Sequence, residues 1–322
     1  MDDNDQAPSE LETLTLALLH SRGEVERLRE RELLVSSLLG GLNAVLWAFD
    51  WGQQRVVYVS PAYEQIFGRS AALLLADYNE WLNSIYPDDM EYAARSLASV
   101  HELGSVEQRE YRIIRGDGEV RWLSDKCFVS PSKLFGGQSL IVGIAEDITE
   151  KKALQSELHR LATRDVLTGA SNRRHFFECA EVLFAEARSS GSPLSFLLLD
   201  IDDFKKINDG HGHQVGDRVL QRVAHCGAYV LRRDDLFGRI GGEEFAALFP
   251  NCDAEQARQV AERLQREVQR LQFANDGESF GVTISQGITL LGEGDVLDDL
   301  YARADAAMYQ AKRQGKDCIV LG

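Results

Sequence analysis

Two groups of carboxylates in the second half of the chain have the residue types and surroundings that metal and phosphate chemistry requires. Asp200 ends the largely apolar run 194–199. Glu243 and Glu244 follow two glycines and stand between two apolar runs. A carboxylate at the end of a buried strand is costly without a partner, and adjacent like charges repel unless a cation neutralises them. If the two groups meet, their oxygens form a site for a hard cation such as Mg²⁺.

Each group also has an ordinary structural explanation. Two glycines between apolar runs predict a tight β-hairpin, because glycine tolerates the positive φ angles of hairpin turns. The two glutamates would then be a solvated hairpin tip. Asp202 or Asp203, just after the apolar run, would cap the following helix. The local spacing leaves both explanations open.

The elements expected after residue 163 favour a shared site. Helices are expected over 173–188 and 213–231, a central strand over 194–199, and a hairpin from 236 to 249. This order places Asp200 and Glu243 on adjacent strands of one antiparallel sheet. Carboxylates on neighbouring strands can hold two Mg²⁺ ions that bridge a triphosphate while a hydroxyl attacks its α-phosphate. The sequence has no Gly-x-x-x-x-Gly-Lys-Ser/Thr loop, which excludes a P-loop NTPase.

Size and charge narrow the class of protein. A chain of 322 residues is long enough for two domains, and its net charge of −16 argues against binding to duplex nucleic acid or to an anionic membrane. The five cysteines are far apart and odd in number, which favours reduced thiols. No apolar stretch approaches eighteen residues, and the N-terminus is acidic, unlike a signal peptide. We expect a cytoplasmic protein without a membrane segment.

The first half divides into three segments by pattern. Residues 9–39 carry apolar residues at heptad spacing, which favours a coiled-coil helix, with an amphipathic helix packed on its own domain as the alternative. Residues 44–148 alternate short strands and helices. The charged helix expected over 149–164 is a connector. The predicted domains are therefore 1–41, 42–148, 149–164 and 165–322.

The second segment resembles a PAS domain, a sensory or dimerisation module. The motifs, in chain order, are Tyr58-Val59-Ser60-Pro61, Tyr86-Pro87-Asp88-Asp89, Asp117-Gly118-Glu119 and Gly143-Ile144-Ala145-Glu146-Asp147. Such domains hold haem, flavin, a small metabolite or no ligand, and the ligand here is unknown. A single histidine such as His101 is more often a solvated or capping residue than a haem ligand. Cys127 lies in an expected strand, without the helical motif of blue-light flavin domains.

The last segment resembles a GGDEF diguanylate cyclase over residues 160–322. The motifs, in chain order, are Asp165-Val166-Leu167-Thr168-Gly169, the run 200–209, His213-Gln214-Val215-Gly216-Asp217, Gly241-Gly242-Glu243-Glu244-Phe245 and Ala304-Asp305-Ala306-Ala307-Met308-Tyr309. Glu243 replaces the usual aspartate and keeps the carboxylate. The resemblance implies an α/β (α+β) fold in which helices surround a central mixed or antiparallel sheet, as in nucleotide-cyclase palm domains.

The resemblance also implies a nucleotidyltransferase that makes cyclic di-GMP from two GTP molecules and releases two pyrophosphates. Asp200, the Ile201 carbonyl and Glu243 would hold two Mg²⁺ ions per site. Glu244 or Glu243 would help to deprotonate the attacking hydroxyl. The resemblance further implies that Lys205 stabilises charge at the reacting phosphorus. Phosphates would be bound by the amides of Asp203 and Phe204 and by the side chains of Lys312 and Lys316. Guanine would be bound by Asn208 and Asp217, with His213 nearby. Lys316 stands where the family usually has arginine, so the charge is kept but a bidentate pair of hydrogen bonds to phosphate is lost.

Regulation and assembly follow from the same resemblance. Arg232 and Asp235 match the family's Arg-x-x-Asp product-inhibition site, and a charged helix-to-strand turn is the alternative. Because each active site holds one GTP, two sites must face each other, so a homodimer under PAS control is expected. The alternative functions are a catalytically silent receptor for GTP or cyclic di-GMP and a purely structural PAS dimerisation protein. Intact Asp200, Lys205 and Glu244 argue against the receptor, and the second half of the chain against the structural protein.

Overall fold

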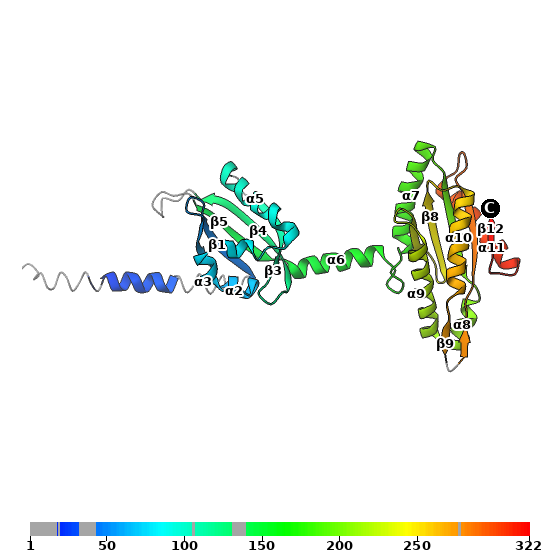
Figure 1. The fold of residues 1–322 in the computed structure, drawn as a ribbon, viewed down its shortest axis with the longest axis horizontal. Helices are drawn as coiled ribbons and strands as arrows, with labels where there is room; N and C mark the ends of the chain where they lie inside the picture. Colours follow the sequence, from blue (N-terminus) through cyan, green and yellow to red (C-terminus); the bar gives the residue numbers. More distant parts are fainter. Residues whose placement is uncertain (1–17, 19, 32–42, 105–106, 131–139, 276–277) are drawn as a thin grey trace, which may run out of the picture. The chain divides into compact units, whose positions relative to one another are not determined.

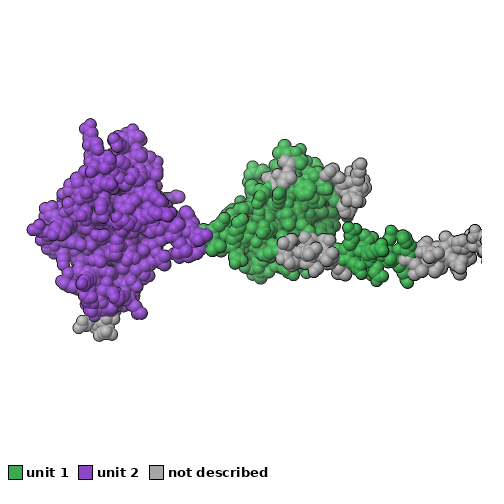
Figure 2. All heavy atoms as spheres, turned by 180° about the vertical axis from the view of Figure 1, so that it is seen from behind, with its two compact units in different colours: residues 1–155 green, residues 156–322 purple. Residues whose placement is uncertain are grey.

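The computed structural model describes residues 18, 20–31, 43–104, 107–130, 140–275 and 278–322. The chain divides into two compact units, residues 1–155 and 156–322 (Figure 2). Most of the coiled coil expected over 9–39 lies outside the described residues, so that expectation stays a prediction. Residues 20–31 are helical and exposed.

The first unit contains one antiparallel sheet covered by short helices (Figure 1). The strand order is β2-β1-β5-β4-β3. The strands are β1 (Ala44–Asp50), β2 (Arg55–Val59), β3 (Glu107–Ile114), β4 (Val120–Ser130) and β5 (Leu140–Asp147). The helices are α2 (Ala62–Phe67), α3 (Ala71–Ala76), α4 (Asn79–Leu82), η1 (Pro87–Asp89) and α5 (Met90–Leu103). Buried residues of α2 and α5, such as Tyr63 and Leu97, share one core with strand residues such as Tyr111.

Helix α6 (Thr149–Thr163) follows β5 and begins beside its last residue. The Thr149 amide donates to Asp147 Oδ1 at 3.0 Å, and the Thr149 hydroxyl donates to the same oxygen at 2.6 Å. These bonds satisfy a polar group at the start of the helix. Within the described structure α6 has no buried residue. Its apolar residues Leu154, Leu158 and Leu161 are all exposed.

The second unit is a five-stranded mixed sheet with helices on both faces (Figure 1). The strand order is β12-β11-β6-β8-β7, in which only β11 and β12 are parallel. The strands are β6 (Leu194–Ile201), β7 (Leu236–Arg239), β8 (Glu244–Pro250), β11 (Ile284–Leu290) and β12 (Ile319–Leu321), and β9 (Phe273–Asn275) with β10 (Glu278–Phe280) forms a separate hairpin. The fold class predicted from the sequence is confirmed for both sheets.

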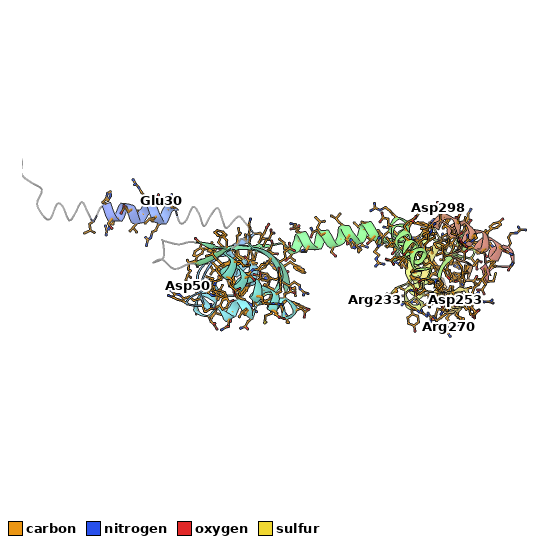
Figure 3. All side chains as sticks on the ribbon, turned by 90° about the horizontal axis from the view of Figure 1, so that it is seen from above. Glu30, Asp50, Arg233, Asp253, Arg270 and Asp298 are labelled. Carbon is orange, nitrogen blue, oxygen red and sulfur yellow. The ribbon has the colours of Figure 1, made fainter. Side chains whose placement is uncertain are left out.

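The central strand β6 is buried along its whole length because both of its faces are covered. Leu197 and Leu199 belong to the core under α8 (Phe204–His211), α9 (His213–Val230) and α10 (Ala254–Gln269). Phe196 and Leu198 belong to the core under α7 (Arg173–Ser190) and α11 (Leu297–Arg313). This alternation is the period of two that a strand imposes. Helix α10 starts at a capping box in which Asp253, labelled in Figure 3, accepts from the Gln256 amide.

Helix α11 lies directly against β11. A Cβ added to Gly287 of β11 would lie 2.1 Å from the Ala304 carbonyl oxygen and 2.4 Å from the Met308 nitrogen. Only a residue without a side chain permits this separation of helix and strand. The close packing fixes where α11 ends, and the end of α11 carries Lys312 beside the end of β6.

Candidate functional site

The two carboxylate groups predicted to converge do so at the end of β6. Asp200 is 4% exposed and is paired in register with Glu244 of β8. The Ile201 amide donates to the Glu243 carbonyl at 3.3 Å, which joins the strand end to the hairpin tip. Burial raises the pKa of Asp200 to about 6, against the opposing effect of Lys312 and with a smaller contribution from the two glutamates. A buried carboxyl with a perturbed pKa beside other charged groups is a candidate for a functional site.

The glycines of the hairpin have a different purpose from the one that the sequence predicted. The loop between β7 and β8 is closed by the Ile240 amide, which donates to the Glu244 carbonyl at 3.0 Å. Gly241 and Gly242 are not among the residues with positive φ, so the expectation of positive turn angles was wrong. A Cβ on Gly241 would lie 2.4 Å from Glu244 Oε2. Gly241 therefore makes room for the Glu244 carboxylate.

Two arginines hold the hairpin tip in place. The Arg239 guanidinium donates to the Gly242 carbonyl at 2.6 and 3.1 Å and to Asp165 Oδ1 at 3.1 Å. Arg173 donates to the Ile240 carbonyl at 2.8 Å. A tip fixed through its own carbonyls is more than a solvated turn, because its carboxylates are presented in a set position. The sequence reasoning missed both arginines, since nothing local links them to the tip.

The residues at this strand end fit Mg²⁺ when substrate completes the coordination. Within the described residues, no three His, Cys, Asp or Glu side chains form a cluster that would hold a metal ion by themselves. Asp200 and Glu243 would supply two carboxylates, and Mg²⁺ in nucleotide enzymes commonly takes one or two carboxylates together with phosphates and water. A cation there would also favour the charged form of Asp200.

Neither aspartate that was considered as a helix cap uses its side chain in that way. Asp203 occupies the position before α8 with a left-handed φ of 55°, and no capping bond from its side chain is found in the described structure. Its carboxylate lies 2.8 Å from Lys206 Nζ and 2.7 Å from Lys316 Nζ. These two lysines lower the pKa of Asp203 to about 2. The Asp202 carboxylate is bonded elsewhere, to Thr283, Ser285 and Asp317.

The lysines expected at the phosphates reach the same strand end from α11. Lys312 Nζ lies 2.7 Å from Asp200 Oδ2, and Lys316 Nζ bonds Asp203 from the turn after the helix. Lys205 is an exposed residue in the first turn of α8. The amides of Asp203 and Phe204 lie at the N-terminus of α8, where backbone N–H groups favour anions.

The residues expected to read guanine gather where α8 meets α9. A Cβ on Gly216 would lie 1.9 Å from Asn208 Oδ1, so the Asn208 amide packs directly against the first turn of α9. Asp217 is the next residue along, and His213 begins the helix; both are exposed. The two helices turn at Gly212, whose φ of 83° requires glycine.

Arg232 and Asp235 form the turn between α9 and β7. The Arg232 amide donates to Asp235 Oδ2 at 2.8 Å, while the residue itself is exposed. Burial raises the pKa of Asp235 above its ordinary value. The neighbouring Arg233 lies at the periphery of the second unit (Figure 3). The two residues lie together, and the turn leaves Arg232 accessible.

The first unit contains an aromatic cavity of about 40 Å³ with a buried ion pair. Arg109 donates to Asp125 Oδ2 at 2.7 and 3.1 Å, and both side chains are 1% exposed. The Tyr63 hydroxyl also lines the cavity and has no hydrogen-bond partner in the described structure. Burial raises its pKa to about 12, so it stays neutral. His101 stacks on Trp51 and is not among the lining residues.

The sequence reasoning missed Arg109 and Asp125, although one signal was available. Arg109 stands two residues before Tyr111 and four before Ile113, both apolar and buried. A period of two places all three on the same face of β3. An arginine on the buried face of a strand requires a buried partner, and Asp125 lies opposite Arg109 in register on β4.

Comparison with known proteins agrees with the fold and the order of the two domains. Residues 162–318 match the family described as diguanylate cyclase, GGDEF domain, and residues 56–145 match the PAS fold. A diguanylate cyclase of Vibrio cholerae is 31% identical over 272 residues, which cover 82% of each chain. The chain belongs to the diguanylate cyclase family, and a PAS domain precedes its GGDEF domain as predicted.

Two further comparisons cover the second unit. The response regulator PleD of Caulobacter vibrioides is 43% identical over 163 residues, which are 50% of this chain and 36% of PleD. A solved structure of the coiled coil and GGDEF domain of DgcB from Caulobacter crescentus, in complex with c-di-GMP, shares 30% identity at a TM-score of 0.52. That match covers 54% of this chain and 93% of the DgcB chain. In the described part of the chain, no helix is long and apolar enough to cross a membrane.

Proposed function

We propose that this enzyme condenses two GTP molecules into cyclic di-GMP, with release of two pyrophosphates, in a Mg²⁺-dependent reaction across a homodimer. The observation that carries the proposal is the convergence of Asp200, the Glu243-Glu244 tip and Lys312 at the end of β6. Carboxylates from two segments and the ammonium group of Lys312 thus lie together at the end of the central strand. Mg²⁺ bound there would neutralise the triphosphate and lower the pKa of the attacking hydroxyl.

The protein residues hold the triphosphate and the attacking 3′-hydroxyl, and one of them accepts the proton of that hydroxyl. Asp200, Glu243 and the Ile201 carbonyl would provide the metal ligands. The amides of Asp203 and Phe204 bind the terminal phosphates, with Lys312 and Lys316 beside them; the metal-holding Asp200 already lies within 2.7 Å of Lys312 Nζ.

Lys205 faces the charge that develops on the attacked phosphorus, where a fixed cation stabilises the transition state most. Glu244 is our choice as the group that accepts the proton of the 3′-hydroxyl, because Gly241 leaves room for its carboxylate. Asn208 and Asp217 bind the guanine edge, with His213 near them.

The direct test is turnover by the purified full chain with GTP and Mg²⁺, with the products separated by chromatography. We expect cyclic di-GMP and pyrophosphate in a ratio of one to two, and no product with EDTA. Glu244→Gln should reduce kcat by a factor of about 10² to 10⁴, the range for loss of a general base, while GTP still binds. A receptor would bind GTP equally well in both proteins and turn over neither.

We infer that the product inhibits the enzyme at Arg232 and Asp235. The bond from the Arg232 amide to Asp235 shapes the turn and leaves the guanidinium accessible for two-pronged bonds to guanine or phosphate. Arg232→Ala should therefore let product accumulate to a higher level before turnover stops. Arg233→Ala, which removes the neighbouring charge, is the matched control and should stop where the wild type stops. Equal plateaus in all three proteins would refute the inhibitory site.

We propose that the PAS domain controls how two cyclase domains meet, and that the enzyme works in the cytoplasm. All five cysteines lie within the described residues and are free thiols, as expected in a reducing compartment. The PAS cavity of about 40 Å³ accommodates a water molecule or a few, whereas a haem or a flavin requires its lining side chains to move. An absorption spectrum of the purified protein tests this directly, because both cofactors absorb visible light.

A further inference from the structure

A buried aspartate that the proposed reaction does not use lies two residues after Asp200. Asp202 is 6% exposed, and its carboxylate accepts three hydrogen bonds. Oδ1 accepts from the Ser285 hydroxyl at 2.6 Å, and Oδ2 accepts from the Thr283 hydroxyl at 2.7 Å. Oδ2 also accepts from the backbone amide of Asp317 at 3.1 Å. A buried carboxylate with three donors is held firmly, because each lost bond would leave a polar group unsatisfied.

The bond to Asp317 reaches an unusual turn between α11 and β12. Lys316 and Asp317 have φ values of 65° and 46°, in the left-handed region that residues other than glycine enter at a cost. The Lys316 amide donates to the Ala311 carbonyl at 3.1 Å, so the turn also closes the end of α11. Two adjacent residues keep such a conformation only when their surroundings determine it.

Helix α10 holds the same turn through two glutamines. Gln265 Nε2 donates to the Asp317 carbonyl at 2.6 Å and to its Oδ1 at 2.9 Å. Gln269 Nε2 donates to both carboxylate oxygens of Asp317, at 2.9 and 2.7 Å. Asp317 is therefore fixed between the sheet and α10, and its backbone conformation is set from both sides.

The side chain that leaves this turn is Lys316. Its Nζ lies 2.7 Å from Asp203 Oδ2 at the start of α8, and the side chain is 38% exposed. Asp203 also has a left-handed φ, of 55°. Asp202 thus directly precedes Asp203, the partner of Lys316, and it accepts a hydrogen bond from Asp317, which directly follows Lys316.

We propose that Asp202 is a positioning residue for the cyclase reaction. By holding the Asp317 backbone, it directs Lys316 at the phosphates bound at the N-terminus of α8. This inference rests on the proposed function, because it requires Lys316 to contact GTP. A lysine on a flexible stem has many orientations, and a fixed backbone reduces the number that it samples before substrate binds.

A double-mutant cycle on the full chain tests the inference by steady-state kinetics with GTP. Lys316→Met should raise KM about tenfold, the usual effect of losing one charge-assisted contact to phosphate. Asp202→Ala should raise KM about fivefold, with a smaller change in kcat. The double variant should be no worse than Lys316→Met alone, because Asp202 acts through that lysine.

Two further variants separate positioning from folding. Thr283→Val removes one donor to Asp202 but leaves the bond to Asp317, and its KM should stay within about twofold of the wild type. Gln269→Ala loosens the turn from the exposed side of α10, where folding is less at risk. Its KM should rise in the same direction as that of Asp202→Ala, and this rise should vanish in the Lys316→Met background.

The outcomes distinguish the inference from the function beneath it. If the effects of Lys316→Met and of either partner variant multiply, Asp202 and the turn do not act through Lys316, and the inference is overturned while the cyclase mechanism stands. If Lys316→Met alone leaves KM unchanged in an active enzyme, Lys316 does not bind GTP. The phosphate role in the proposed function then fails, and the inference fails with it.

Discussion

Asp200 is less stable as a carboxylate in the folded protein than in water. Burial raises its pKa from the ordinary 3.8 to about 6, and Lys312 opposes this shift without removing it. A raised pKa means that the folded chain binds the proton more tightly than the unfolded chain. The resulting stability is present below the unfolded pKa and is lost as the pH rises through the folded pKa. Asp200 thus lowers stability at neutral pH in the absence of a cation.

We expect Asp200→Asn to reveal this penalty. Between pH 5 and pH 8 the wild type should lose about 1 kcal/mol of unfolding free energy that the variant keeps, because the variant has no proton to release. Urea unfolding of both proteins at the two pH values, in EDTA, measures the difference. A gap between the two proteins that does not change with pH would mean that Asp200 titrates normally.

In the first unit, Arg109 and Asp125 are both buried, so each charge depends on the other for its neutralisation. Asp125→Ala should lower the unfolding free energy by about 3 to 5 kcal/mol, since it leaves a buried guanidinium without its counter-ion. Glu91→Ala removes a partner of Arg95 from an ion pair whose side chains are 75% and 82% exposed. It should change stability by less than about 1 kcal/mol.

Thermal and urea unfolding of the PAS unit within the full chain compare these variants. A double replacement, Arg109→Met with Asp125→Leu, should recover part of the loss, since apolar residues replace the two charges. The recovery is incomplete because Trp47 Nε1 and the Tyr111 hydroxyl lose Asp125 as their acceptor. If Asp125→Ala behaves like Glu91→Ala, the pair is not buried as described.

At the scale of elements, the active site depends on how α11 lies on β11. Gly287→Ala should destabilise the second unit by about 1 to 3 kcal/mol, because the new methyl group requires a backbone shift. It should also lower kcat/KM for GTP, since α11 carries Lys312 to Asp200. Gly210→Ala is the control: apart from the neighbouring backbone of its own helix, no described atom lies within 4 Å of its added Cβ, and α8 should gain up to about 1 kcal/mol. Circular dichroism melts and GTP turnover measure both effects.

If Gly287→Ala has wild-type stability and activity, the close approach of helix and strand is not required. A loss of stability with unchanged kcat/KM would mean that the close packing stabilises the unit but is not needed to position Lys312.

At the scale of the whole molecule, α6 carries a stripe of leucines that are exposed in the described structure. Leu154, Leu158 and Leu161 are 59%, 57% and 45% exposed, at a spacing that returns to one side of a helix. Because the proposed reaction joins two GTP molecules held in two active sites, we expect this stripe to pair with its copy in a dimer.

Leu154→Ser with Leu158→Ser should shift the protein towards monomer and lower its specific activity at least about tenfold at nanomolar concentration, with recovery at higher concentration. Gln155→Ser with His159→Ser, on the other side of the same helix, is the control. Analytical ultracentrifugation and turnover across a dilution series provide the measurements. Dimers of unchanged strength in the leucine variant would place the interface elsewhere.

Much of the fold and of the site follows from the sequence. The apolar run 194–199 predicts a central strand, and the alternation of expected strands and helices after residue 163 predicts a sheet covered by helices. Asp200 and the Glu243-Glu244 pair are recognisable locally, because charged residues that interrupt apolar runs need a reason to be there. The PAS and GGDEF motifs are equally local, and both families are confirmed.

Beyond the meeting of Asp200 with the hairpin, only the tertiary structure decided which distant residues meet. Lys312 reaches Asp200 across more than a hundred residues because Gly287 lets α11 lie against β11, and no pattern in the sequence encodes that approach. The same holds for Asp202, which looked like a helix cap and instead holds the turn beside Lys316. Residue type and spacing determine the local chemistry, whereas contacts between distant residues depend on how the helices and strands pack against one another.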